Sequence, residues 1–183
     1  MPSKRRKPCR VKYYDAAVSK KSTEETSVVP LSADEEDFFR AFMRAMVAVP
    51  RAFDADLLGE QGMSVSEYGV LMRLSEAPDR QMRMSDLAVA SSLSVSGMTR
   101  IVARLEKQDL VRRERCVTDR RGWLAVLTDS GLERLRAAWP THLASVRRHM
   151  MNDLSGLDLK SLTAAFRRFA AEDDVPKPPG ENT

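Results

Sequence analysis

The fold is decided by one stretch, Met84–Gly131, which reads MSDLAVASSLSVSGMTRIVARLEKQDLVRRERCVTDRRGWLAVLTDSG. Its apolar residues recur at helical spacing over a short segment and, after a turn at Ser91–Leu93, over a longer one of about Val95 to Gln108. A β-like run to Val117, a polar tip and a second run from Trp123 predict a hairpin. This order of elements predicts a mainly α fold with a small β-wing, which is a winged helix-turn-helix.

The longer helix has two different faces. Met98, Ile101, Val102 and Leu105 form its apolar side. The opposite side starts with small polar residues after the capping Ser94 and becomes basic, with Ser96, Gly97, Thr99, Arg100 and Arg104 as its candidate DNA contacts. Small residues let a backbone approach a groove, and Ser, Thr and Arg can bond to base edges and phosphates. Alone, this face could be a solvated surface; the basic hairpin that follows favours DNA binding.

Positive charge is concentrated in two places. The chain has a net charge of +4, and residues 1–21 hold eight Lys and Arg against one Asp, so the remainder has a net charge of −3. The second basic place is the segment 100–121, which holds eight Lys and Arg against four Asp and Glu. We expect phosphate contacts from some of Arg112, Arg113 and Arg115, and Arg120 is a further candidate DNA contact. The strand arginines could instead be edge charges that deter aggregation.

Length and composition predict one core with flexible ends. The 183 residues suit a single domain, and we expect a disordered basic arm over 1–31, a winged-helix and dimerisation domain over 32–172 and a flexible tail over 173–183. The arm could reach DNA or simply add solubility. Two distant cysteines, no signal peptide and no apolar run of membrane length favour a cytoplasmic protein without membrane contact.

Flanking helices extend the domain. A capping box at Ser32–Glu35 starts a long apolar-striped helix that Pro50 should kink or split. Ser85 is expected to cap the short helix of the opening stretch and Thr128 the helix after the hairpin, and a last helix is expected at about 158–171.

The sequence contains none of the common catalytic motifs. It lacks a nucleophile elbow, a phosphate-binding glycine loop and a metalloprotease motif. His142 and His149 are two helical turns apart, about 10 Å, too far for one metal to bridge without further ligands. We therefore expect no enzyme, no catalytic residue, no metal and no cofactor.

Three segments resemble the MarR (multiple-antibiotic-resistance regulator) family: MSDLA at 84–88, MTRIVARLEKQDLVRR at 98–113 and DRRGWLAVLTDSG at 119–131. The resemblance covers roughly residues 34–172. It implies a homodimer that presents two recognition helices and two wings to a pseudo-palindromic DNA site. By position, it makes Arg121 the wing arginine of the minor groove and Asp119 the partner that holds it or a neighbouring arginine.

The resemblance also implies a regulator, most often a repressor relieved by a small, often aromatic ligand. Such a ligand would lodge between the dimer helices and the DNA-binding lobe, where Met46, Tyr68 and Met72 are candidate pocket walls, or else core residues. The alternative function is an architectural or weakly specific DNA-binding protein without an effector.

Overall fold

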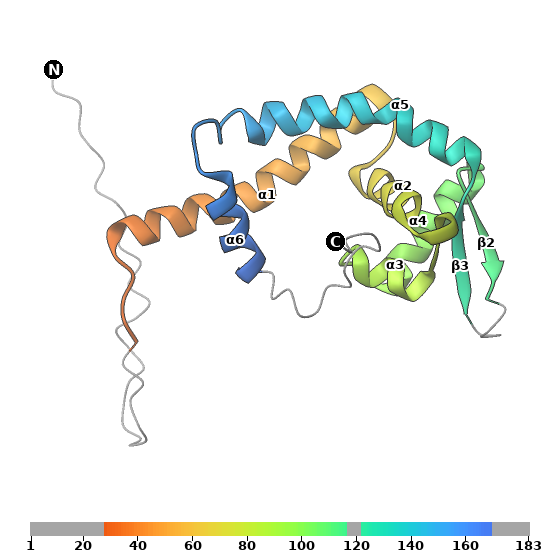
Figure 1. Ribbon diagram of the computed structural model, residues 1–183, viewed down its shortest axis with the longest axis horizontal. Helices are drawn as coiled ribbons and strands as arrows, with labels where there is room; N and C mark the ends of the chain where they lie inside the picture. The colour runs from red at the N-terminus through yellow and green to blue at the C-terminus, as the bar shows by residue number, and fades with distance from the viewer. Residues whose placement is uncertain (1–27, 117–121, 170–183) are drawn as a thin grey trace, which may run out of the picture. The chain divides into compact units, whose positions relative to one another are not determined.

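The computed structural model describes residues 28–116 and 122–169 (Figure 1). The elements are α1 (Ala33–Gln61), α2 (Val65–Glu76), a 3-10 turn η1 (Pro78–Arg80), β1 (Gln81–Arg83), α3 (Met84–Ala90), α4 (Val95–Lys107), β2 (Val111–Arg115), β3 (Trp123–Leu127), α5 (Asp129–Val146), a π-helical turn η2 (Arg147–Met151) and α6 (Leu159–Phe169). The chain separates into two units, Met1–Phe38 and Phe39–Thr183, and the elements that build the candidate site lie in the second. The described part is a mainly helical chain with a small sheet, as the sequence predicts.

Helix α1 begins as its capping box predicts and ends at a glycine. The Ser32 backbone N–H donates to Glu35 Oε2 at 2.7 Å, and the Glu35 N–H donates back to the Ser32 hydroxyl at 3.3 Å. Gly62, with φ of +61°, ends the helix. The helix runs through Pro50 without being divided, so a split at this position is wrong. A proline removes only one bond of the ladder.

A closed apolar core joins α2, α3 and α4 to the sheet. Its fully buried side chains include Tyr68, Leu71, Leu74, Leu87, Met98, Val102 and Leu105. The sheet has the antiparallel order β1-β3-β2, in which Val111 lies opposite Leu127 and Arg115 opposite Trp123. This lobe holds α4 and the hairpin of β2 and β3, here called the wing, on one packed core.

Helix α3 starts two residues earlier than its sequence suggests. Arg83 occupies the cap position and Met84 is the first helical residue, so the prediction of Ser85 as the cap is wrong. Strand β1 runs directly into the helix, which places Ser85 in the first turn with its hydroxyl bonded to Asp86 at 3.0 Å.

Helix α5 is fastened to the C-terminal half of α1, and the two lie side by side in Figure 1. The Asp56 Oδ2 atom accepts from the Ser145 hydroxyl at 2.7 Å, from His149 Nε2 at 3.0 Å and from the Arg148 guanidinium at 3.3 Å. The Ser145 hydroxyl is the main reason that the pKa of Asp56 lies below its ordinary value, and burial opposes the effect. A single carboxylate therefore ties α1 to the end of α5.

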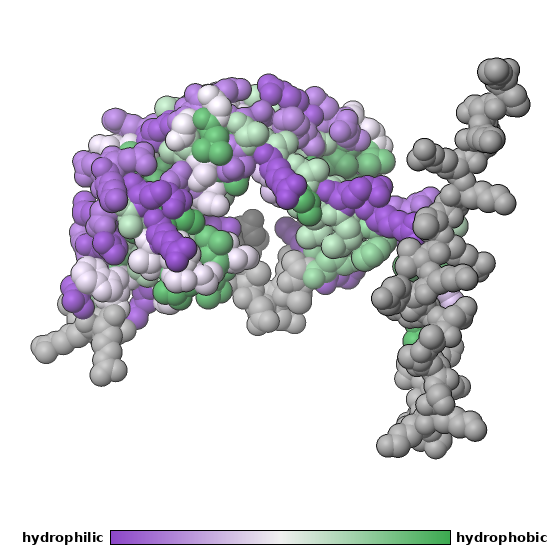
Figure 2. Space-filling model, turned by 180° about the vertical axis from the view of Figure 1, so that it is seen from behind, coloured by the Kyte–Doolittle hydropathy of each residue, from purple (hydrophilic) through white to green (hydrophobic). Residues whose placement is uncertain are grey.

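The long helices leave many large apolar side chains exposed. Those at least about two fifths exposed include Phe39, Met43, Met46 and Val47 on α1, Trp139 and Leu143 on α5, and Leu159, Phe166 and Phe169 on α6. Figure 2 shows apolar surface gathered at α6 and the part of α1 beside it. Within the described residues, none of the helices is both long and apolar enough to cross a membrane.

Candidate nucleic-acid interface

The N-terminus of α4 is capped and carries small polar side chains. The Ser94 hydroxyl accepts from the Gly97 N–H at 3.1 Å and lies 3.1 Å from the Ser96 hydroxyl. The Thr99 hydroxyl donates to the Val95 carbonyl at 2.8 Å, which leaves the rest of this exposed side chain on the surface. A Cβ added at Gly97 would lie 3.2 Å from the Ser94 hydroxyl. Gly97 therefore leaves space for the Ser94 hydroxyl, and without a side chain it lets another molecule approach the helix backbone closely.

The two arginines predicted on α4 have different surroundings. Arg100 is exposed and makes no ion pair within the described residues. Arg104 donates through Nε to Glu67 on α2 at 2.9 Å. Burial alone would raise the pKa of the Glu67 carboxyl, but bonds from the Ser64 backbone and from Arg104 outweigh burial and lower it. Arg104 therefore links α4 to the core, and Arg100 is the better placed of the two to meet DNA.

The inner face of the wing is apolar near the core and basic towards the tip. Residues opposite one another on β2 and β3 share a face, so Arg113 lies beside the buried Ala125 and Arg115 beside Trp123. Arg113 pairs with Glu106 of α4, at 2.7 Å from the nearer guanidinium nitrogen. The predicted contacts Arg113 and Arg115 thus share the side of the wing that faces α4.

Arg112 belongs to the other face of β2. It pairs with Glu114 two residues along the strand, at 2.5 Å, and lies opposite Val126. The strand therefore presents two of its arginines towards α4 and keeps the third away from it, a separation that the alternation of a β-strand imposes.

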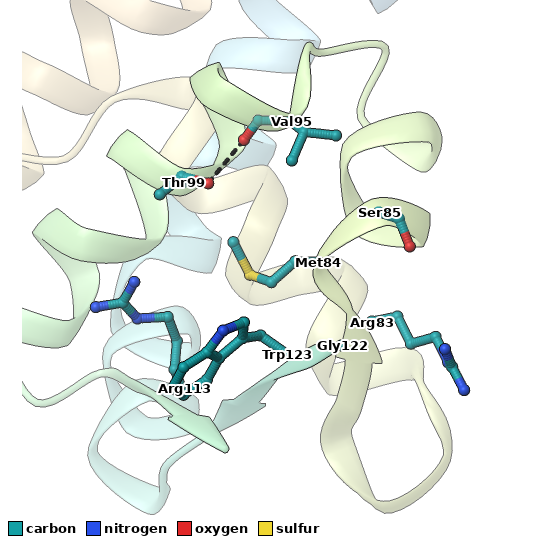
Figure 3. Close-up of a pocket in the computed structure, with 8 residues that line it drawn as sticks. All are labelled: Arg83, Met84, Ser85, Val95, Thr99, Arg113, Gly122 and Trp123. Atoms are coloured by element: carbon teal, nitrogen blue, oxygen red, sulfur yellow. Dashed lines mark hydrogen bonds between the residues drawn. The ribbon is translucent and has the colours of Figure 1, made fainter. Parts of the chain in front are cut away.

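A groove opens between the start of α3, the first turns of α4 and the wing (Figure 3). It has a volume of about 410 Å³, and its lining residues include Met84, Thr99, Arg113 and Trp123. The Arg83 side chain points away from Trp123 in this view, as expected from its position opposite Leu124 on the outer face. The groove connects the surface of the recognition helix with that of the wing.

The tip of the wing lies outside the described residues. It contains three sequence-predicted contacts, Asp119, Arg120 and Arg121. Just before the tip, the Cys116 N–H donates to the Gly122 carbonyl at 3.0 Å, so the bonding between the two strands continues one residue beyond the pair Arg115 and Trp123.

The candidate ligand residues are not alike. Tyr68 is 1% exposed in the core, Met72 packs against that core, and Met46 is 56% exposed on α1. The Tyr68 ring lies 4.4 Å from the His142 ring, and within the described residues neither the Tyr68 hydroxyl nor His142 Nδ1 has a hydrogen-bond partner. Burial raises the pKa of Tyr68 and lowers that of His142, and in both side chains it favours the neutral form.

Sequence reasoning missed the residues that hold the basic side chains. Glu67, Glu106 and Trp123 were not among the predicted site residues, yet they contact Arg104, Arg113 and Arg115. Only Glu67 had a local signal, as the fourth residue of the box Ser64–Glu67 that caps α2.

Two solved structures match this fold over nearly their whole length. AbsC, a MarR family transcriptional regulator from Streptomyces coelicolor, is 38% identical, with a TM-score of 0.72 and coverage of 79% of this chain and 97% of AbsC. Sco3205, a regulator of the same family and organism solved in complex with DNA, is 36% identical, with a TM-score of 0.73 and coverage of 82% and 98%. The MarR family model matches residues 61–122.

The chain belongs to the MarR family.

Members of this family are transcriptional regulators and not enzymes, which confirms two predictions from the sequence. A Thauera aromatica protein named as a regulator of the hcr operon is 29% identical over 92 residues, which is 50% of this chain and 54% of that relative. The chain thus matches about half the length of this relative. The matched residues 61–122 contain α2, α3, α4 and β2. The family match therefore falls on the lobe that these elements build, which we call the reading lobe.

Proposed function

We propose that this MarR-family chain is a homodimeric repressor that binds a pseudo-palindromic DNA site and leaves it when a small ligand binds. The observation that carries the proposal is the shared surface of α4 and the wing, where the exposed polar turn of α4 meets the arginines of β2 across one groove. Sco3205, which is 36% identical, was solved in complex with DNA, and this supports a DNA-binding role for the present chain.

In the proposed complex, α4 enters the major groove by its N-terminal turns. The first turn of α4, which is capped by Ser94 and contains Ser96, presents backbone N–H groups to a phosphate, and Arg100 reaches the base edges, where arginine pairs with guanine. The DNA backbone then crosses the groove between α4 and the wing, with Arg113 and Arg115 beside it. Arg121 enters the minor groove, as the family resemblance implies.

The exposed apolar side chains of α1, α5 and α6 support the dimer. Monomeric proteins rarely expose large contiguous apolar patches, and Phe42 already stacks on Phe166 at 5.7 Å between ring centroids to join α1 to α6. A second copy of the chain would bury the remaining apolar side chains. Two copies would present two recognition helices about one turn of DNA apart, roughly 10 base pairs.

The Tyr68–His142 pair supports a ligand site. Buried polar atoms normally have partners, and the Tyr68 hydroxyl and His142 Nδ1 have none in the described chain, where the rings of Phe53 and Trp139 lie beside that of His142. An aromatic ligand with a hydroxyl or carboxylate would supply the missing bond and stack on the rings. Because Tyr68 is in the core of the reading lobe, which comprises α2, α3, α4 and the sheet, and His142 is on α5, such a ligand would act at their junction.

Binding to selected genomic fragments tests the DNA-binding part. The full chain should prefer its own site to random duplex by roughly 10³ or more at physiological salt, and Arg100→Ala should reduce that preference more than Arg104→Ala. Equal affinity for all sequences would instead indicate an architectural DNA-binding protein. Light scattering should give the mass of two chains, and a monomer that binds one half-site would contradict the dimer.

A ligand screen tests the effector part. Aromatic acids and phenols that raise the melting temperature of the wild type should release DNA, and Tyr68→Phe should lose this response while it keeps DNA binding. If the variant responds as the wild type does, the ligand binds elsewhere.

A further inference from the structure

Trp123 lies where the inner face of the wing changes from buried residues to exposed ones. The pair nearest the core on this face is Val111 and Leu127, both buried, and the pair nearest the tip is Arg115 and Trp123. Trp123 is 40% exposed. Exposing a large apolar ring to water at the end of a strand is unfavourable in free energy. The core beside the ring is already complete at the fully buried Ala125. The ring therefore needs an explanation other than core packing.

The indole contacts both arginines of this face. The guanidinium carbon of Arg115 lies 4.3 Å from the ring centroid and that of Arg113 lies 6.0 Å from it. Both distances fall within the range of a cation–π interaction, for which tryptophan is the best partner. Figure 3 shows Arg113 beside the ring at the edge of the groove, with Met84 and Thr99 on the facing side.

We propose that Trp123 is a positioning residue for DNA binding, which holds the guanidinium groups of Arg113 and Arg115 on the α4 side of the wing. This inference rests on the proposed DNA-binding function and assigns a role within that same surface. A phosphate that crosses the groove then meets two arginines that are already directed towards it.

The reason is the flexibility of arginine. Its side chain loses rotational freedom when it binds a phosphate, and this loss weakens binding unless the side chain is ordered beforehand. Glu106 fixes Arg113 from the α4 side, at 2.7 Å. The flat ring of Trp123 restricts Arg115 without adding a negative charge that would repel DNA.

Two substitutions distinguish the effect of the aromatic ring from the effect of an apolar side chain at position 123. Trp123→Phe keeps an aromatic face and should bind the DNA site within about threefold of the wild type. Trp123→Leu keeps an apolar side chain but removes the π face. It should weaken binding about tenfold and reduce the slope of log affinity against log salt by close to one unit, the value of one phosphate contact. Wild-type affinity in Trp123→Leu would overturn the proposal.

A double-mutant cycle tests whether the ring acts through the arginines. In a chain that carries Arg113→Gln and Arg115→Gln, the further change Trp123→Leu should have no additional effect on affinity. Arg112→Gln is the control, because it removes a positive charge from the other face of β2, and there Trp123→Leu should keep its full effect. A full effect in the Arg113/Arg115 background would mean that the ring contacts DNA or supports the fold, which would overturn the positioning role.

A measurement on the free protein distinguishes failure of this inference from failure of the proposed function. In NMR spectra without DNA, the side-chain protons of Arg115 should be shifted upfield by the indole ring current in the wild type, and the shift should be absent in Trp123→Leu. If the shift is present but the wild type prefers no DNA site, the proposed function is wrong. If the wild type binds its site and the cycle shows no coupling, the positioning role is wrong.

Discussion

Helices α2 and α1 show how differently two parts of this molecule use their apolar residues. Helix α2 has 12 residues, and five of them are buried in the reading lobe. Helix α1 has 29 residues, and Leu57 alone among them is buried. The reading lobe thus completes its core within one chain, whereas the long helices carry an apolar face that residues 28–116 and 122–169 do not cover. Folding of the lobe and pairing of the long helices are therefore separable, and substitutions in the two regions should have different signatures.

The largest effect is expected in the lobe. Leu105 is fully buried on α4, so Leu105→Ala removes a packed side chain and leaves a cavity, which typically costs about 2–5 kcal/mol of unfolding free energy. Urea unfolding at several protein concentrations measures this loss, which should be the same at each concentration. Leu143→Ala on α5, where the side chain is 42% exposed, is the matched control and should cost much less at high concentration. Equal costs would contradict the comparison.

The next largest effect is expected on the exposed apolar face of α5. Trp139 is 51% exposed on α5, and a tryptophan at the centre of an interface typically contributes 2 kcal/mol or more to binding. Trp139→Ala should therefore raise the dimer dissociation constant by about thirtyfold or more. Sedimentation equilibrium over a dilution series measures this constant. Unchanged dissociation would place Trp139 outside the interface.

A smaller effect is expected where α4 meets α2. Arg104→Ala would leave the buried Glu67 carboxylate without its guanidinium partner, and an unpaired buried group typically costs about 1–3 kcal/mol. The loss should be small at low pH, because the lowered pKa of Glu67 means that its stabilising contribution is present above the ordinary glutamate pKa and disappears as the carboxyl is protonated. Arg100→Ala on the exposed face of α4 is the control and should leave stability unchanged.

The smallest effect concerns pH and the junction between the two regions. Burial lowers the pKa of His142, so the unfolded chain takes up a proton near the ordinary histidine pKa of about 6.5 while the folded chain does not. Stability should therefore fall as the pH drops from about 7.5 towards 5.5, and His142→Gln should flatten that part of the curve. An unchanged slope in the variant would show that another group causes it.

The sequence predicts the parts of the molecule that depend on near neighbours. The caps at Ser94 and Thr128 are present, each accepting from a backbone N–H three residues on at 3.1 and 2.9 Å, because a cap is a bond within one turn. The apolar face of α4 is the core face, because helical periodicity fixes it.

The rest depends on contacts between distant positions. Glu67 and Arg104 are 37 residues apart, and their pairing follows from how α2 packs on α4, which periodicity does not specify. The stacking of Arg115 on Trp123 requires the strand register, which is set across the hairpin. The start of α3 at Met84 was missed because β1 runs straight into the helix and leaves no separate cap residue.

The carboxylate of Asp56 has a mechanical consequence. Because one oxygen accepts from Ser145, Arg148 and His149, sliding α5 along α1 by a turn would break three bonds at once. The start of α5 is fixed as well, because the Thr128 hydroxyl donates to the Asp109 carbonyl at 2.7 Å and the Thr128 N–H donates to the Leu110 carbonyl at 3.2 Å. Helix α5 is therefore held at one end by the reading lobe and at the other end by α1, and it acts as a strut whose length sets the separation between them.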